Sequence, residues 1–261
     1  MQRRAFLNAL PALALAPGAQ AQTAFPSRPV TLVVPFAPGG VADVTARTVG
    51  QAMAASLGQP VVVDNRPGAG GIVATQAVLK APADGHTLLL MSNATAVSVH
   101  LVRKLPYDVQ KDLAPVTTLG FFELGLAVAS GSRFKTLKDL LAHGRAQPGK
   151  LSIGTIAVGS TQHLSAELFK ARTGLDAVVV PYKGSPAVVN ALRSGEIDLA
   201  FEVLSPLLPQ LQGGTVRLLA VTGPQRFAGL PEVPTALEQG VPNYTVDSWN
   251  ALAAPAGTPA R

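Results

Sequence analysis

A short turn rich in proline and glycine constrains the fold of this chain more than any other feature. The turn covers residues 35–43, with the sequence Pro-Phe-Ala-Pro-Gly-Gly-Val-Ala-Asp. It follows the apolar run Val30–Val34, and a helical pattern begins at Val41. The first amides of a helix have no partners within the helix, and glycines let a ligand approach the main chain closely. The turn therefore predicts a binding site for a carboxylate or a similar small anion.

The order of strand, small-residue turn and helix start recurs twice further along the chain. One copy covers residues 151–163, with Gly159 in its turn, and the other covers residues 178–186, with Gly184 in its turn. Helix starts of this kind favour negative charge, because the macrodipole places partial positive charge there. We therefore expect a second surface of the same kind to face residues 35–43.

Three residues in these later turns allow more than one role. Ser160 and His163 have the residue types of a nucleophile and its base, but no G-x-S-x-G motif surrounds the serine. Hydrolysis, a packed or capping histidine, and ligand contact therefore all remain open for His163. Lys183 stands just before a helix start, where its charge does not favour the dipole, so it is either solvated or directed at an anion.

Polar residues of the first part of the chain also have two interpretations. Asp43 favours the helix dipole, or it accepts a hydrogen bond from a ligand amine or a bridging water. The amine contact would favour an amino-acid ligand over a plain polyacid. Ser92 and Asn93 follow an apolar strand expected at residues 87–91, where they act as helix N-caps, ligand contacts or both.

Residues 1–21 indicate a cleavable signal peptide. Arg3 and Arg4 precede an apolar stretch at residues 5–16, and the sequence Ala-Gln-Ala at 19–21 gives a small-x-small cleavage site. The apolar stretch is too short to span a bilayer. The arginine pair also fits a twin-arginine signal, so Sec and twin-arginine export both remain open.

The absence of cysteine from the 261 residues limits both the chemistry and the location of the protein. It excludes disulfides, thiolate metal sites and a lipid-modified N-terminal cysteine. An exported protein without an anchor is retained by a cell only behind an outer membrane, so we expect the periplasm. Removal of the signal peptide leaves a chain long enough for two α/β domains or one large one.

The composition argues against several classes of ligand. The formal net charge is +6, but charged residues make up only 14% of the chain and no basic cluster alternates with aromatics, so nucleic acid is not expected. The glycine loop at residues 67–71 has Val73 where a dinucleotide motif needs a third glycine. The four histidines show no paired spacing for a metal. We therefore expect neither a cofactor nor a metal.

The order of these motifs along the chain indicates a protein family more specifically than any single motif does. Their order resembles that of the tripartite tricarboxylate transporter (TTT) substrate-binding proteins, also called the Bug family of periplasmic receptors. The resemblance extends from about Phe25 to Arg261. The matching stretches are residues 35–43, 67–71, 84–88, 105–108, 111–112, 180–185, 195–198, 219–222, 231–235 and 255–259.

The resemblance implies a type II periplasmic-binding-protein fold, in which two α/β domains are joined by two crossing strands and hold a ligand between them. The first domain is expected over residues 22–126, the second over 127–222, and a return segment of the first over 223–261. The apolar stretch at residues 116–128 is expected to cross between them. Family members continue past the segment at 255–259, so we expect a chain that ends without those helices to be less stable.

The resemblance also implies a ligand and partners. The expected protein is a monomeric receptor that captures a dicarboxylate, tricarboxylate or acidic amino acid and delivers it to integral membrane transporter subunits. A sensor subunit for a membrane kinase is the alternative in the same fold, and a periplasmic hydrolase is the alternative from another class. Glu202 stands where the family has aspartate after Phe201, which leaves the polar specificity of that wall open. The expected ligand contacts are Ala37, Pro38, Gly39, Gly40, Asp43, Asn93, Gly159, Ser160, Thr161, His163, Lys183 and Glu202.

Overall fold

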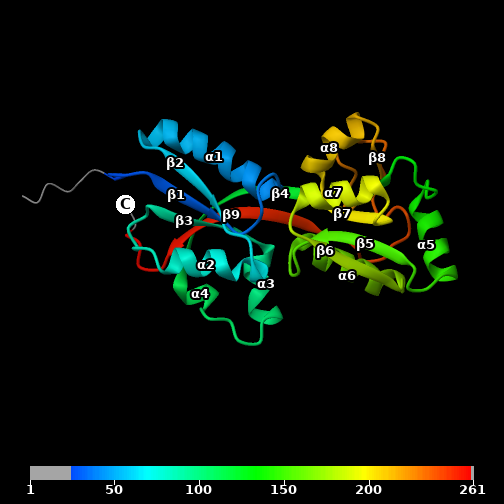
Figure 1. Cartoon of the computed structure of the whole chain (residues 1–261), viewed down its shortest axis with the longest axis horizontal. Coiled ribbons are helices and arrows are strands. Elements are labelled where there is room, and N and C mark those ends of the chain that lie inside the picture. Colours follow the sequence, from blue (N-terminus) through cyan, green and yellow to red (C-terminus); the bar gives the residue numbers. More distant parts are fainter. Residues whose placement is uncertain (1–24, 260–261) are drawn as a thin grey trace, which may run out of the picture.

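A computed structural model describes residues 25–259, which form two α/β halves lying side by side (Figure 1). Nine strands make one curled sheet that passes from one half into the other. The strand order is β2-β1-β3-β9-β4-β7-β5-β6, and β8 pairs with β4 outside this order. The predicted signal peptide lies outside the described residues. Within them, no helix is long and apolar enough to cross a membrane.

The first half is built on three parallel strands with helices on both faces. Val30, Leu32 and Val34 point to the face covered by the first helix, while Val33 packs with Ala74 on the other face. A strand covered on both sides has a nearly continuous apolar sequence, as β1 does with Thr31 as its only polar residue. The elements are β1 (Val30–Val34), α1 (Val41–Leu57), β2 (Val61–Asn65), a 3₁₀ turn (Ala69–Gly71), α2 (Ile72–Leu79), β3 (Thr87–Ser92), α3 (Asn93–Leu101) and α4 (Val109–Asp112).

The second half repeats this plan around a larger core. The rings of Phe201 and Tyr244 both meet Phe169 edge-on, with centroids 5.4 and 5.6 Å away, and all three side chains are fully buried. Such aromatic pairs add to the free energy gained from burial alone. The elements are α5 (Leu137–Ala146), β5 (Leu151–Ile156), α6 (Thr161–Thr173), β6 (Ala177–Tyr182), α7 (Ser185–Ser194), β7 (Leu199–Val203), α8 (Leu204–Gln212) and β8 (Val216–Val221).

Two long antiparallel strands join the halves (Figure 1). These are β4 (Leu113–Ala129) and β9 (Asp247–Pro255). They pair with each other as far as Glu123, and from Leu124 onward β4 pairs with β7 and β8 of the second half. The predicted crossing stretch at residues 116–128 falls within β4. Two α/β parts joined by two crossing strands, as the sequence predicted, are therefore confirmed.

The return to the first half comes later in the chain than the expected boundary at residue 223. Residues 223–246 stay against the second half, where Val246 N donates to Thr222 O at 3.0 Å. Tyr244 is fully buried in the core of that half, and its hydroxyl lies 2.6 Å from Ser165 Oγ on α6. Burial of Tyr244 therefore holds residues 223–246 against the second half. The chain returns to the first half only along β9.

Candidate functional site

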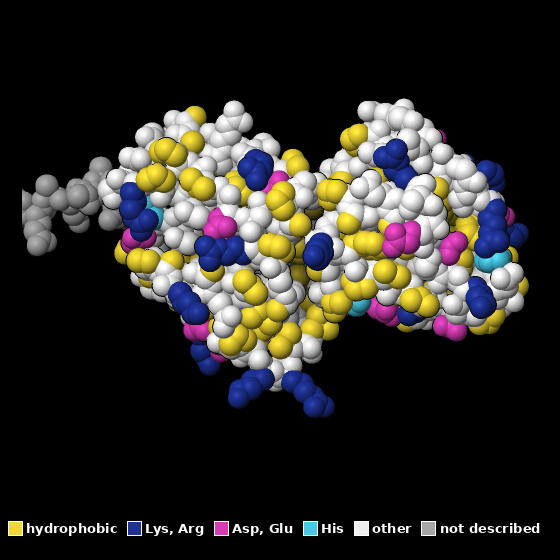
Figure 2. Space-filling model, viewed as in Figure 1, with side chains coloured by type: hydrophobic (Ala, Val, Ile, Leu, Met, Phe, Trp, Pro, Cys, Tyr) yellow, Lys and Arg dark blue, Asp and Glu magenta, His cyan; other side chains and the backbone are white. Residues whose placement is uncertain are grey.

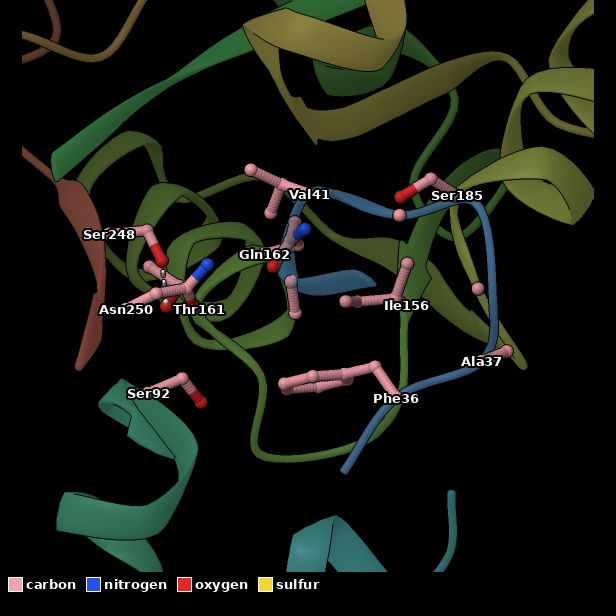
Figure 3. Close-up of a pocket in the computed structure, with 13 residues that line it drawn as sticks. Phe36, Ala37, Val41, Ser92, Ile156, Thr161, Gln162, Ser185, Ser248 and Asn250 are labelled. Carbon is pink, nitrogen blue, oxygen red and sulfur yellow. Dashed lines mark hydrogen bonds between the residues drawn. The ribbon is translucent and has the colours of Figure 1, made fainter. Parts of the chain in front are cut away.

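The N-termini of four helices meet at one cavity between the two halves (Figure 3). The first half contributes the starts of α1 and α3, and the second half contributes the starts of α6 and α7. The space between them is partly open to solvent. The lining residues are Phe36, Ala37, Gly40, Val41, Ala42, Ser92, Ile156, Thr161, Gln162, Gly184, Ser185, Ser248 and Asn250.

Three of these helix starts leave their first amides without a side-chain cap. Gly40 and Gly184 are the N-caps of α1 and α7 and have no side chain to offer. Ser92 is the N-cap of α3, but its buried hydroxyl caps no amide and has no hydrogen-bond partner. Amides at a helix start have no acceptor four residues earlier in the helix. The cavity therefore offers several unpaired N–H donors to a bound molecule.

The cavity attracts negative charge without any cationic side chain. Among the described residues, no lysine or arginine lines it, and no aspartate or glutamate does. Each helix start carries partial positive charge, which favours an anion most strongly where water is excluded. Phe36, Val41 and Ile156 supply an apolar wall beside these amides. The arrangement suits a small anion that has a carbon skeleton.

Figure 2 shows the two halves side by side with a narrow groove at the surface between them. Gly39 has a φ of +84°, and a Cβ placed on it would lie 3.2 Å from Pro186 Cγ on α7. A Cβ on Gly184 would lie 3.2 Å from Cβ of Ala37. The glycines therefore serve a purpose beyond ligand access, since they let the two turns approach each other.

The side chain of Asp43 stabilises the turn at residues 35–43 by a hydrogen bond and does not line the cavity. It is 4% exposed, its Oδ2 accepts from Gly39 N at 3.0 Å, and Arg47 binds both of its oxygens. Burial acts to raise the pKa of Asp43, but the hydrogen bonds from Arg47 and Gly39 outweigh it and hold the pKa below its usual value. Both oxygens are thus engaged by protein groups.

Glu202 lies behind the cavity wall, fully buried at the end of β7. Its Oε1 accepts from Gln162 Nε2 and from Val203 N, both at 2.8 Å. Burial raises the pKa of Glu202, against smaller effects of Gln162, Val203 N and the Ser185 hydroxyl. Its Oε2 makes no hydrogen bond of regular geometry. Glu202 therefore supports a lining residue and does not line the cavity itself.

The serine and histidine considered as a catalytic pair have other roles. Ser160 is the N-cap of α6, where its Oγ accepts from the backbone N of His163 at 3.2 Å and donates to Ile156 O at 3.3 Å. No hydrogen bond among the described residues joins Ser160 Oγ to the His163 ring. The geometry is that of a helix cap.

The structure distributes the other expected contacts over several surfaces. Ala37, Gly40 and Thr161 line the cavity itself. Asn93 ties α3 to β9, since its Oδ1 accepts from Trp249 N at 3.1 Å. Of the rest, Pro38 is exposed, and Ser160 and Lys183 line an adjoining space. Gly159 and His163 line an apolar hollow, and Gly39 lies at the outer rim by α7.

The sequence of most of the chain matches the model of a known protein family. Residues 45–261 match the tripartite tricarboxylate transporter family receptor, TctC. The chain belongs to this family. Among its curated relatives, BugT of Bordetella pertussis is 42% identical over 237 residues, which cover 90% of this chain and 72% of BugT. The family resemblance drawn from the motifs is thereby confirmed.

Solved structures share the fold of this TctC-family chain. Rpa4515 of Rhodopseudomonas palustris, solved with adipate, has a TM-score of 0.87 and 39% identity, covering 90% of this chain and 79% of that one. MatC from the same organism, solved with bound malate, has a TM-score of 0.85 and 34% identity, covering 90% and 80%. The fold is that of the periplasmic binding proteins, as the sequence predicted.

Several lining residues of this TctC-family chain were missed in the sequence. Gln162 and Ser185 lie inside turns that had been singled out, so their position gave a usable signal. Ser248 and Asn250 lie on β9, far from the turns in sequence. Their spacing of two residues places both on one face of the strand, which was the only pattern available to find them. The hydroxyl groups of Ser248 and Thr161, which both line the cavity, are hydrogen-bonded, with 3.0 Å between Ser248 Oγ and Thr161 Oγ1.

Proposed function

We propose that this chain is a periplasmic receptor that captures a small organic acid and delivers it to a membrane transporter of the tripartite tricarboxylate type. The acid is a dicarboxylate, a tricarboxylate or an acidic amino acid. The observation that carries the proposal is the convergence of four helix N-termini on one cavity that no charged side chain lines within the described residues.

The distribution of these helix starts favours a ligand with more than one carboxylate. Two belong to the first half and two to the second, so each half offers amides to one end of a short molecule. A partly buried helix terminus stabilises an opposite charge by up to about 2 kcal/mol. The apolar wall of Phe36, Val41 and Ile156 suits the methylene groups between two carboxylates.

Such a ligand favours closure, because it contacts both halves only when they are together. β4 and β9 connect the halves and serve as the hinge. Binding then shifts the population from open to closed molecules by the difference in affinity between the two states. A membrane partner that recognises both halves at once would distinguish loaded from empty receptor.

The related proteins support the ligand class and the route of delivery. Rpa4515 was solved with adipate and MatC with malate, and both molecules are dicarboxylic acids. The family to which the chain belongs is described as receptors of the tripartite tricarboxylate transporters. This membership supports the two remaining parts of the proposal, delivery to such a transporter and residence in the periplasm.

Thermal unfolding in the presence of candidate ligands tests the proposal. A carboxylate at one hundred times its Kd should raise the free energy of unfolding by about 2.7 kcal/mol, while sugars and nucleotides leave it unchanged. Dicarboxylates of four to six carbons, a tricarboxylate and acidic amino acids form the test set. Stabilisation by sugars or nucleotides, with none by any carboxylate, would contradict the proposal.

A further inference from the structure

The orientation of one side-chain amide in the cavity is fixed from behind. Gln162 is 4% exposed, and its Nε2 donates to Glu202 Oε1 at 2.8 Å. The same Oε1 also accepts from Val203 N at 2.8 Å, so this oxygen acts as an acceptor and the group facing it must be a donor. The NH₂ group of Gln162 is therefore held toward Glu202, away from the ligand.

The carbonyl oxygen of Gln162 is left for whatever occupies the cavity. No hydrogen bond among the described residues uses Gln162 Oε1, and Gln162 lines the cavity. Figure 3 shows Gln162 near the centre of the labelled residues, between Phe36 and Ile156 on one side and Asn250 on the other. The cavity thus presents a hydrogen-bond acceptor in its middle, in addition to the amide donors around its edge.

Asn250 adds a second acceptor. It is 2% exposed, and its Nδ2 donates to Thr45 Oγ1 at 3.3 Å on the first half. Its carbonyl oxygen enters no hydrogen bond within the described residues. Both side-chain amides that line the cavity therefore use their donors on the protein and leave their acceptors unused.

An acceptor in this place discriminates between organic acids. A carboxylate oxygen cannot donate to Gln162 Oε1, so it repels that oxygen or leaves it unpaired. A hydroxyl group donates to it without bringing charge. An ammonium group also donates, but it brings a positive charge to four helix N-termini, and no carboxylate lines the cavity to offset that charge. The oxygens of Asp43 are already bound by Gly39 N and Arg47.

We propose that Gln162, held in place by Glu202, selects an organic acid that carries a hydroxyl group on its carbon chain. Such an acid binds more tightly than the unsubstituted acid or the amino acid of equal length. This inference rests on the proposed function as a carboxylate receptor. Gln162 is the residue that determines specificity, and Glu202 is a positioning residue that acts through it.

Calorimetric titration of the full chain with matched sets of acids tests this selection. Each set holds one chain length: succinate, malate and aspartate; glutarate, 2-hydroxyglutarate and glutamate; adipate, 2-hydroxyadipate and 2-aminoadipate, with both enantiomers of each chiral acid. In the set that binds most tightly, the hydroxy acid should exceed the unsubstituted acid about tenfold in affinity, since an unpaired buried acceptor is costly. The amino acid should bind more weakly than the hydroxy acid.

Substitution of Gln162 tests the assignment to this residue. Q162M keeps the length of the side chain and removes the acceptor, so the affinity ratio of hydroxy to unsubstituted acid should fall to about one. Q110M changes a glutamine that is exposed on α4 and should leave the ratio unchanged. The ratio within one variant is insensitive to a general loss of stability.

Substitution of Glu202 tests the positioning role. E202M removes the acceptor that holds the Gln162 NH₂ group, so Gln162 can turn its donor to the cavity and the ratio should fall. E202Q keeps an acceptor oxygen for Gln162 and Val203 N, and it should restore the ratio. A purely structural role for Glu202 predicts instead that both variants change overall affinity and leave the ratio as it was.

The outcomes separate the two proposals. If no carboxylate binds, the proposed function fails and this selection fails with it. If carboxylates bind and the wild-type chain shows equal affinities for hydroxy and unsubstituted acids, the function stands and the role of Gln162 is overturned. Tightest binding of an amino acid also overturns it. A wild-type preference that persists in Q162M would assign the selection to another residue.

Discussion

Glu123 and Asp247 face each other as paired residues of β4 and β9, at the point where the two strands pass between the halves. Burial, and then the charge of Asp247, raise the pKa of Glu123 above its usual value, and Glu123 Oε2 is buried without a partner. Two like charges directly opposite each other in a sheet are destabilising. The pair of strands that connects the two halves therefore contains a repulsive pair.

The removal of this repulsion should stabilise the protein. We expect Glu123→Gln to raise the free energy of unfolding at pH 7 by about 0.2–1 kcal/mol, the usual size of a side-chain interaction across two strands. A folded-state pKa above the unfolded value means that ionised Glu123 costs stability at high pH, and this cost disappears as the pH falls toward the unfolded pKa. The gain should therefore vanish near pH 4. Urea unfolding at both pH values, with the exposed Glu232→Gln as control, measures it.

The first amide of α1 should contribute directly to ligand affinity. Proline is tolerated at the first helical position but has no N–H, so Val41→Pro removes one donor from the cavity and leaves the helix intact. We expect affinity for the best carboxylate to fall about tenfold, because hydrogen bonds to charged groups are strong. Val109→Pro makes the same change at the start of α4 and should leave affinity unaltered. Unchanged affinity in V41P would argue against the use of this amide.

The contact between the turn at Gly39 and the start of α7 should affect closure of the two halves more than folding. Gly39→Ala places a Cβ 3.2 Å from Pro186 Cγ at a φ of +84°, so it should weaken both the closed state and carboxylate affinity. Gly58 has a similar φ of +67° with nothing within 4 Å. Gly58→Ala should therefore cost about 1 kcal/mol of unfolding free energy without loss of affinity. Calorimetric titration together with urea unfolding separates the two effects, and equal affinities in both variants would count against closure.

Ser160 should behave as a helix cap and not as a nucleophile. Ser160→Ala removes the acceptor of His163 N, so we expect a loss of about 1 kcal/mol in unfolding free energy. Carboxylate binding should remain, because Ser160 does not line the cavity at the four helix N-termini. Urea unfolding and titration measure both quantities. An ester-hydrolysing activity that is present in the wild type and lost in this variant would support the alternative of a hydrolase.

Local pattern was sufficient to predict much of this fold. The apolar runs at Val30–Val34 and Thr87–Ser92 are buried strands, and the glycine turn before α1 does lie at the cavity. These features depend on neighbours within a few residues, such as uncapped amides, turn glycines and buried side chains. The order of such features along the chain was also enough to indicate the family.

Tertiary structure decided which side chains reach the cavity and in which orientation. Ser248 and Asn250 enter it only because β9 pairs with β3 and β4, and residues more than one hundred positions apart carry no local sign of that pairing. Asp43 was placed at the correct turn, but its contacts with Gly39 and Arg47 decided its role. Sequence alone was enough to predict an anion site at these turns, since helix starts and glycine turns are local. Which end of the Gln162 amide faces the cavity depends on its hydrogen bond with Glu202. The two residues lie on different elements and meet only in the folded core.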